Sequence, residues 1–255
     1  MKSSFLRRLI NAPYLLWSAI FIIVPLVIVA YYALTDESGN YTLSYILNIG
    51  EYKEVFIRSL VYAVIATLIT LVMSYPVAYY ISRSTEKMQN ILVLIITIPT
   101  WINMLVRTYA WRGILLNVPI SAEMKVLIGM VYNFIPFMIL QIYTSLSKMD
   151  KSLLQAASDL GADGIQSFLR VTLPLSIPGV VSGITLVFLP TVSSFFIPKL
   201  LGGGDYVLIG NLIENYFVST GDWNFGSAIS LIMAVIIMVS MYLTKKIDKD
   251  VEGQK

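Results

Sequence analysis

The chain has 255 residues, of which 57% are hydrophobic and only 13% are charged, and its mean hydropathy is +0.76. A soluble domain carries about twice that charged fraction because its surface faces water, so the composition argues against a soluble globular enzyme. The lack of Cys and His excludes thiol nucleophiles, disulfides, zinc sites on these residues and His-based acid–base catalysis, and the net charge of +3 is too small to indicate nucleic-acid binding.

Six uncharged segments are long enough to cross the bilayer core, which is about 30 Å thick and takes about 20 apolar residues as a helix. In chain order they are residues 9–35, 59–82, 88–106, 126–147, 171–198 and 223–244. They lack the polar residue at about every second position that a strand barrel needs, and a helix satisfies its own backbone in lipid. The sequence therefore predicts an all-α integral membrane protein with six transmembrane helices in one domain, residues 9–244.

The first segment could instead be a signal peptide, because Lys2, Arg7 and Arg8 precede it. Its apolar stretch is too long for a signal peptide, and no small-residue cleavage pattern follows it. We therefore interpret residues 9–35 as a retained first helix.

Lysine and arginine set the predicted orientation. With residues 1–8 inside, 12 of these cations fall in inner segments and 6 in outer segments. This distribution favours a cytoplasmic N-terminus and a cytoplasmic tail of residues 245–255. The acidic residues divide into 7 inside and 8 outside.

The predicted inner segment of residues 148–170 has the pattern of folded structure rather than of a simple connector. Its apolar residues recur at the spacing of one helix face, as Leu153, Ala157 and Leu160. Gly161 is expected to end this helix, and Asp163 can cap a second short one. The alternative is an amphipathic helix on the lipid surface, but the polar face is uncharged rather than rich in lysine. The small residues suit a surface that another protein approaches closely.

The same segment resembles the cytoplasmic signature of permease subunits of ABC-type importers. That signature has a Glu-Ala-Ala start, a Gly four residues after the second Ala, and a Leu-Pro further on. The matching residues are Ala156, Ala157, Gly161, Leu173 and Pro174. Gln155 stands where the family has Glu, so a neutral hydrogen bond would replace any ion pair made by that Glu.

Further stretches are similar to the spermidine/putrescine importer branch of this family, namely residues 107–111, 128–150 and 195–217. The resemblance covers most of the chain from about residue 59 onward. One departure is the outer connection of residues 112–125, which has only 14 residues, whereas relatives in this branch tend to carry a longer one.

The resemblance implies a type I ABC importer permease (MetI-like) architecture and a passive half-channel for polyamines in a bacterial cell membrane. A second permease subunit would complete a heterodimeric pathway, two ATPase subunits would bind ATP and Mg, and an extracytoplasmic binding protein would deliver substrate. The chain itself would be non-catalytic, with no cofactor and no metal, and it contains no Gly-x-x-x-x-Gly-Lys-Ser/Thr phosphate loop. The implied ATPase-coupling residues are Gln155, Ala156, Ala157, Asp159, Gly161 and Asp163.

A polyamine cation needs carboxylates or aromatic faces, and every predicted span is free of acids. The candidate substrate-pathway residues are therefore Trp101, Tyr109, Tyr132, Ser193, Ser194 and Asp205. Trp101 is expected at membrane depth, near Tyr132, and Pro190 breaks the fifth span beside the two serines, which makes its outer half a candidate gate. The alternative is structural, because Trp and Tyr form belts at membrane interfaces and loop acids are mostly just solvated.

A stand-alone secondary transporter or channel for a small solute is the alternative function. Such proteins usually need buried ionisable residues for ion coupling, and the six predicted spans contain none. A membrane-embedded enzyme is a third class, but without His, Cys or a core acid its chemistry has no obvious agent.

Overall fold

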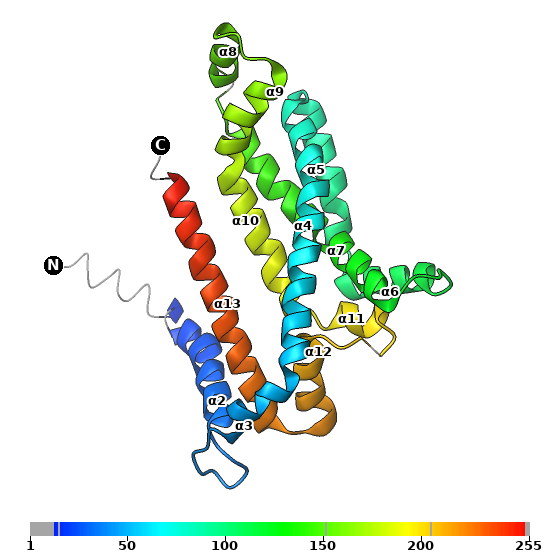
Figure 1. Ribbon diagram of the computed structural model, residues 1–255, viewed down its shortest axis with the longest axis vertical. Coiled ribbons are helices and arrows are strands. Elements are labelled where there is room, and N and C mark those ends of the chain that lie inside the picture. Colours follow the sequence, from blue (N-terminus) through cyan, green and yellow to red (C-terminus); the bar gives the residue numbers. More distant parts are fainter. Residues whose placement is uncertain (1–12, 15, 151, 205, 253–255) are drawn as a thin grey trace, which may run out of the picture. The chain divides into compact units, whose positions relative to one another are not determined.

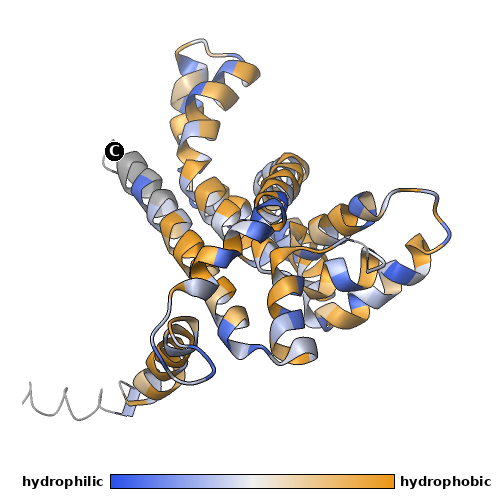
Figure 2. Cartoon of the chain, turned by 60° about the horizontal axis from the view of Figure 1, so that its bottom comes forward, coloured by the Kyte–Doolittle hydropathy of each residue, from blue (hydrophilic) through white to orange (hydrophobic). Residues whose placement is uncertain are grey.

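The computed structural model describes residues 13, 14, 16–150, 152–204 and 206–252. Within these residues the regular elements are helices, apart from one isolated antiparallel bridge between Thr35 and Tyr41. Five helical segments are long and apolar enough to cross a membrane, and a bent pair of helices makes a sixth when it is counted as one span. Figure 2 shows hydrophobic residues along the helices and hydrophilic residues mainly at helix ends and in loops. The predicted all-α membrane fold with six spans is confirmed on this count.

Figure 1 labels the helices, which are given below in chain order. The first two spans contain η1 (Ala19–Ile23), α2 (Val24–Ala33), α3 (Ser44–Asn48), η2 (Ile49–Tyr52) and α4 (Lys53–Arg83). The next helices are α5 (Glu86–Trp101), α6 (Met104–Leu115), α7 (Ala122–Ser147), α8 (Ser152–Asp159) and α9 (Gly164–Ser167). The last are η3 (Phe168–Thr172), α10 (Leu173–Val192), α11 (Phe196–Leu201), α12 (Ile209–Glu214), η4 (Asn215–Thr220) and α13 (Trp223–Glu252).

The chain changes direction inside the predicted third span, residues 88–106. The helices α5 and α6 that occupy this region meet at 89°. Ile102 between them has an extended backbone, with φ −80° and ψ 135°. The Asn103 side chain accepts a hydrogen bond of 2.8 Å from the backbone N–H of Leu105. This cap satisfies a donor that the new helix would otherwise leave free, so the bend is stabilised locally.

The predicted fifth span, residues 171–198, is also interrupted. α10 ends at Val192, and α11 starts at Phe196 after a short break. Pro190 lies in the last turn of α10, where its missing N–H removes a hydrogen bond from the helical ladder.

The chain divides into two compact units, which are described separately: residues 1–53 with 212–236, and residues 54–211 with 237–255. In the first unit, the Asn224 amide donates to the backbone carbonyls of Tyr32 at 3.1 Å and Thr35 at 2.6 Å. These bonds satisfy carbonyls at the C-terminal end of α2.

Aromatic packing joins the remaining parts of the first unit. The Phe225 ring lies 4.7 Å from the ring of Tyr216 and 5.6 Å from that of Tyr52. The hydroxyls of Tyr52 and Tyr216 are 2.7 Å apart. Burial, followed by the bond to Tyr52, raises the pKa of Tyr216 to about 12, so this hydroxyl stays protonated at neutral pH.

The second unit is built around α7, which carries a buried apolar residue at every fourth position. This stripe consists of Val126, Met130, Phe134, Met138, Ile142 and Leu146. It packs in one cluster with residues from α4, α10 and α11, including Ala78, Val187 and Ile197. The four-residue spacing places the stripe on one helix face, and burial of that face fixes the helices around α7.

Candidate functional site

Small residues let α10 pack closely against α7. Gly179 and Gly183 are four residues apart on α10, the spacing that brings membrane helices together when both residues are small. A Cβ on Gly179 would meet the Ser145 side chain and lie 2.8 Å from the backbone oxygen of Gln141. A Cβ on Gly183 would lie 2.5 Å from the sulfur of Met138. This close contact sets which faces of α7 and α10 pack against each other.

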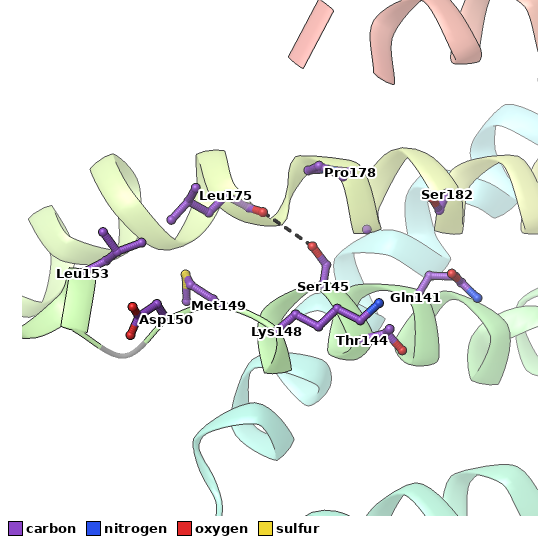
Figure 3. Close-up of a pocket in the computed structure, with 11 residues that line it drawn as sticks. Gln141, Thr144, Ser145, Lys148, Met149, Asp150, Leu153, Leu175, Pro178 and Ser182 are labelled. Carbon is purple, nitrogen blue, oxygen red and sulfur yellow. Dashed lines mark hydrogen bonds between the residues drawn. The ribbon is translucent and has the colours of Figure 1, made fainter. Parts of the chain in front are cut away.

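A cavity of about 640 Å³ lies between α7, α10 and the start of the α8 segment (Figure 3). Most of its polar lining comes from one face of α7, with the residues Gln141, Thr144 and Ser145, and from Lys148 directly after this helix. The Ser145 hydroxyl donates to the backbone carbonyl of Leu175 at 3.5 Å, and Ser182 adds a second hydroxyl from α10. Amide and hydroxyl oxygens of this kind accept hydrogen bonds from a cation or a polar solute.

The two short helices α8 and α9 next to this cavity have well-defined ends. The Asp150 side chain accepts a 2.9 Å hydrogen bond from the backbone N–H of Ser152, and this bond lowers the pKa of that carboxyl. At the other end of α8, the N–H of Ala162 bonds the carbonyl of Ala157 at 3.0 Å. Gly161, with φ of +82°, bonds the carbonyl of Ser158 at 2.9 Å. This pair of bonds is a Schellman motif, in which glycine adopts the left-handed backbone.

The second short helix, α9, is capped by Asp163. Its carboxylate accepts a 2.7 Å hydrogen bond from the backbone N–H of Gln166, and the Gln166 side chain accepts from the Asp163 backbone N–H at 3.4 Å. This arrangement is a capping box. The helix end at Gly161 and the cap at Asp163 that the sequence predicts are confirmed.

The α8–α9 segment presents apolar side chains that the described part of the chain leaves uncovered. Leu160 is 89% exposed and Ile165 is 72% exposed. Of the implied coupling residues, Ala157 is half-buried, and the others are exposed: Gln155, Ala156, Asp159, Gly161 and Asp163. The structure thus places all six on one capped two-helix segment, mostly at its surface.

A second, smaller cavity of about 310 Å³ lies where Leu154 of α8 meets the α4–α5 turn. Gln89 anchors that turn by donating to the backbone carbonyls of Ser82 at 3.2 Å and Ser84 at 3.0 Å. The Tyr143 hydroxyl of α7 donates to the Gln89 amide oxygen at 3.1 Å. The turn is therefore tied to α7, which leads directly into the α8 segment.

The aromatic pathway candidates do not form one cluster. Trp101 is 71% exposed at the bend between α5 and α6, and Tyr109 is 55% exposed on α6. Tyr132 packs its ring against Trp111 of α6, with ring centres 5.1 Å apart. Among the described residues no ring contact joins Tyr132 to Trp101, so the expected pairing of these two side chains is not present.

The two serines lie at the break between α10 and α11. The Ser193 hydroxyl donates to the carbonyl of Leu189 at 3.1 Å, whereas the buried Ser194 hydroxyl has no hydrogen-bond partner within the described chain. Gly210 packs so closely here that a Cβ would lie 2.6 Å from the Ser194 carbonyl oxygen. Asp205 lies outside the described residues.

Sequence reasoning missed the polar face of α7 and the two glycines of α10. Both had a readable signal, because Gln141, Thr144 and Ser145 follow the spacing of one helix face within a predicted span, and Lys148 continues this spacing directly after it. Gly179 and Gly183 form a Gly-x-x-x-Gly pair in the next span. Gly210 had no such signal, since its role depends on a contact with a distant break.

The family model described as "Binding-protein-dependent transport system inner membrane component" matches residues 46–253. The chain is similar to the spermidine/putrescine transport system permease protein PotB of Haemophilus influenzae, with 36% identity over 92% of this chain and 93% of that protein. The protein of the same name from Escherichia coli is 34% identical over 92% of this chain and 97% of its own length.

Two solved structures show the fold. A bacterial ABC transporter involved in the import of the acidic polysaccharide alginate matches with a TM-score of 0.74 and 14% identity, over 98% of this chain and 96% of that chain. The MetNI methionine ABC transporter in an inward-facing conformation matches with a TM-score of 0.60 and 14% identity, over 79% of this chain and 98% of that chain. The predicted importer-permease architecture is confirmed by these matches.

Proposed function

Because this chain belongs to the family of binding-protein-dependent transport system inner membrane components, we propose that it forms half of the translocation pathway of an ATP-driven polyamine importer. A second, different permease subunit completes the pathway, and an extracytoplasmic binding protein delivers spermidine or putrescine. Two ATPase subunits bind ATP and Mg, so this chain has no catalytic role and binds no cofactor. It lies in the bacterial cell membrane with both termini in the cytoplasm.

The capped α8–α9 segment is the observation that supports ATPase coupling most directly. A Schellman motif ends α8 and a capping box starts α9, so both short helices of the segment have defined ends. Its exposed Leu160 and Ile165 need a partner to cover them. In the proposal the ATPase covers this surface, and Gln155, Ala156, Ala157, Asp159, Gly161 and Asp163 form the contact.

The cavity between α7 and α10 supports a role in moving a polar solute. A polyamine carries several positive charges at neutral pH, because its amines titrate near the pKa of lysine. Such a cation is costly to desolvate unless oxygen atoms or aromatic faces compensate. Gln141, Thr144 and Ser182 offer neutral oxygens, and the lining also holds one carboxylate, Asp150, and one cation, Lys148. In the proposal this subunit supplies hydroxyl, amide and aromatic lining, while the binding protein and the second permease supply most carboxylates.

Reconstitution tests this function. The chain is purified alone and with its second permease, ATPase and binding protein, and spermidine uptake into proteoliposomes is measured with and without ATP. We expect uptake only in the complete assembly with ATP, and an ATPase rate that depends on this subunit. Spermidine flux through the chain alone would instead establish the stand-alone transporter, and an assembly that carries another solute but no polyamine would refute the substrate class.

A further inference from the structure

Two rows of side chains join α4 to η3 and the start of α10, next to the α8–α9 segment. The row on α4 consists of Tyr75, Tyr79 and Arg83, and the row on η3 and α10 consists of Phe168, Thr172 and Ser176. Residues four positions apart lie on one helix face, so each row follows one side of its helix. We call these six residues the inner contact.

The Phe168 ring contacts α4 on both sides of a proline. Its centre lies 5.8 Å from the ring centre of Tyr75 and 5.5 Å from that of Tyr79, with an interplanar angle of 89° in both pairs. This edge-to-face geometry is an arrangement that aromatic pairs prefer. Pro76 lies between the two tyrosines in the sequence and cannot donate to the hydrogen-bond ladder of α4. Phe168 therefore supports α4 at the turn where the helix would bend most easily.

Polar bonds add to the inner contact. The Ser176 hydroxyl donates to the carbonyl of Leu173 at 2.8 Å, so its oxygen accepts from the Tyr75 hydroxyl, also at 2.8 Å. The Arg83 guanidinium donates to the Thr172 hydroxyl at 3.5 Å. Ser176 is fully buried, so water does not compete for its bond with Tyr75.

The inner contact begins directly after the α8–α9 segment. α9 ends at Ser167, and Phe168 is the first residue of η3. η3 is a wide π-type turn in which the N–H of Leu173 bonds the carbonyl of Phe168, and turns of this kind are frequent at functional sites. α10 then starts at Leu173 without a loop. A displacement of α9 therefore moves Phe168 and, through its ring, the tyrosines of α4.

The opposite end of α4 contacts the chain beside the break between α10 and α11. The Ser59 hydroxyl accepts a 2.8 Å hydrogen bond from the backbone N–H of Ile209. The next residue, Gly210, lies against the break, where a Cβ would be 2.6 Å from the Ser194 carbonyl oxygen. Tyr75 follows Ser59 by 16 residues of α4, a rise of about 24 Å. One helix thus contacts both the region after α9 and the region at the break.

α4 is also the more continuous of the two helices that connect these regions. α10 connects them along the chain, but Pro178 and Pro190 interrupt its hydrogen-bond ladder. The 31 residues of α4 contain one proline, Pro76, and Phe168 contacts the helix there. We therefore expect α4 to bend less than α10 when its inner end is displaced.

From these contacts we infer that α4 transmits movement of the α8–α9 segment to the break between α10 and α11, with Phe168 and Ser59 as the positioning residues at its two ends. The inference rests on the proposed function, in which the ATPase moves α8–α9. Neither residue needs to contact ATP or spermidine. A variant that breaks the inner contact should therefore hydrolyse ATP with the ATPase still attached, but with less uptake for each ATP.

The test measures spermidine uptake and ATP hydrolysis together, in proteoliposomes that contain the complete transporter. We expect Phe168→Leu, which keeps apolar bulk but removes the ring, to lower the number of spermidine molecules taken up per ATP about fivefold. Phe168→Tyr keeps the ring and should remain within about twofold of the wild type. ATPase co-purification should be normal in both variants. Leu169→Ala is the neighbouring control, because that side chain is 54% exposed, and it should leave uptake per ATP unchanged.

The outer end of α4 is tested by Ser59→Ala, which removes the acceptor of the Ile209 N–H. We expect this variant to lower uptake per ATP as well. The double variant of Phe168→Leu and Ser59→Ala should be no worse than the more affected single variant, because both changes act on the same helix. Effects that multiply in the double variant would show that the two residues act independently, and the inference would be wrong.

Wild-type uptake per ATP in Phe168→Leu would also overturn the inference. Loss of the ATPase from a folded Phe168→Leu variant would overturn it too, because Phe168 would then belong to the ATPase contact. If Phe168→Leu does not fold, Tyr79→Leu removes one of the same ring contacts from the side of α4, and its uptake per ATP decides. Failure of the wild-type transporter to take up spermidine would count against the proposed function instead.

Discussion

Gly161 shows how one residue can set the end of α8. Its φ of +82° and the Schellman bonds around it require a left-handed backbone, which costs an ordinary residue about 1–2 kcal/mol. A Cβ added there would meet no described atom within 4 Å, so the cost of a substitution does not come from crowding inside the chain. Substitutions of different size at Gly161 can therefore distinguish two causes of weaker ATPase association, namely backbone strain and contact with a partner.

We expect Gly161→Asn to retain most ATPase association, because Asn tolerates the left-handed backbone better than other residues. Gly161→Ala should weaken the end of α8 by about 1 kcal/mol, and Gly161→Leu should lose most ATPase in co-purification because its bulk enters the interface. Membrane insertion should be normal in all three. Equal association by the Leu and Ala variants would mean that no partner approaches this residue closely.

Among the aromatic pathway candidates, Trp101 is the most exposed, at 71%, and it lies at the bend of the third span. Trp101→Ala should reduce spermidine uptake several-fold in assembled transporter, because a cation–π contact contributes about 1 kcal/mol. Trp101→Phe keeps a weaker aromatic face, so its rate of spermidine uptake should lie between those of the wild type and Trp101→Ala. Asp205→Asn should act mainly on docking of the binding protein. Normal uptake by Trp101→Ala together with loss of uptake by Asp205→Asn would indicate that the outer acids, and not Trp101, bind the cation.

At the scale of helices, the α7–α10 contact depends on Gly179. We expect Gly179→Ala to destabilise the protein by about 1–3 kcal/mol, because its Cβ would crowd Ser145 and the Gln141 backbone. Gly113→Ala is the matched control, since that helical glycine has open space around it and alanine favours a helix. Thermal unfolding in detergent measures both variants. Equal midpoints for the two would show that α10 does not need the close approach.

The sequence predicts long helices well and their interruptions poorly. The uncharged runs identified the regions of α4, α7 and α13 because a bilayer demands a minimum apolar length. The bend after α5 is stabilised by a cap at Asn103, inside a run that remains apolar on both sides. Hydropathy averaged over a span cannot detect such a cap.

In the candidate site, too, some features were predictable from the sequence and others were not. Gly161 and Asp163 were predictable because capping is local in sequence. The polar face of α7 was predictable in principle from its spacing. The cavity beside Leu154 was not, because it forms only where α8 meets the distant α4–α5 turn.

At the scale of the whole molecule, the orientation can be tested on a clean background, since the chain has no cysteine. Ser38→Cys and Asn215→Cys, both exposed positions, should react with an impermeant maleimide in intact cells. Ser84→Cys and Gly164→Cys should react only after permeabilisation, because the excess of lysine and arginine on their side favours the cytoplasm. Labelling of Gly164→Cys from outside would show that the orientation is the reverse of the predicted one, and α8–α9 could then not be the ATPase contact.

The bend after Trp101 also has a consequence for the lipid around the protein. α5 has 16 residues and rises about 24 Å, which is shorter than a hydrocarbon core of about 30 Å. Either the bilayer thins beside this helix, or the backbone at Ile102 and Asn103 lies at hydrocarbon depth and must be sheltered by protein. Acyl-chain length should therefore affect this crossing more strongly than the long helices α4 and α7, so that hydrophobic mismatch acts on the part of the protein that carries Trp101.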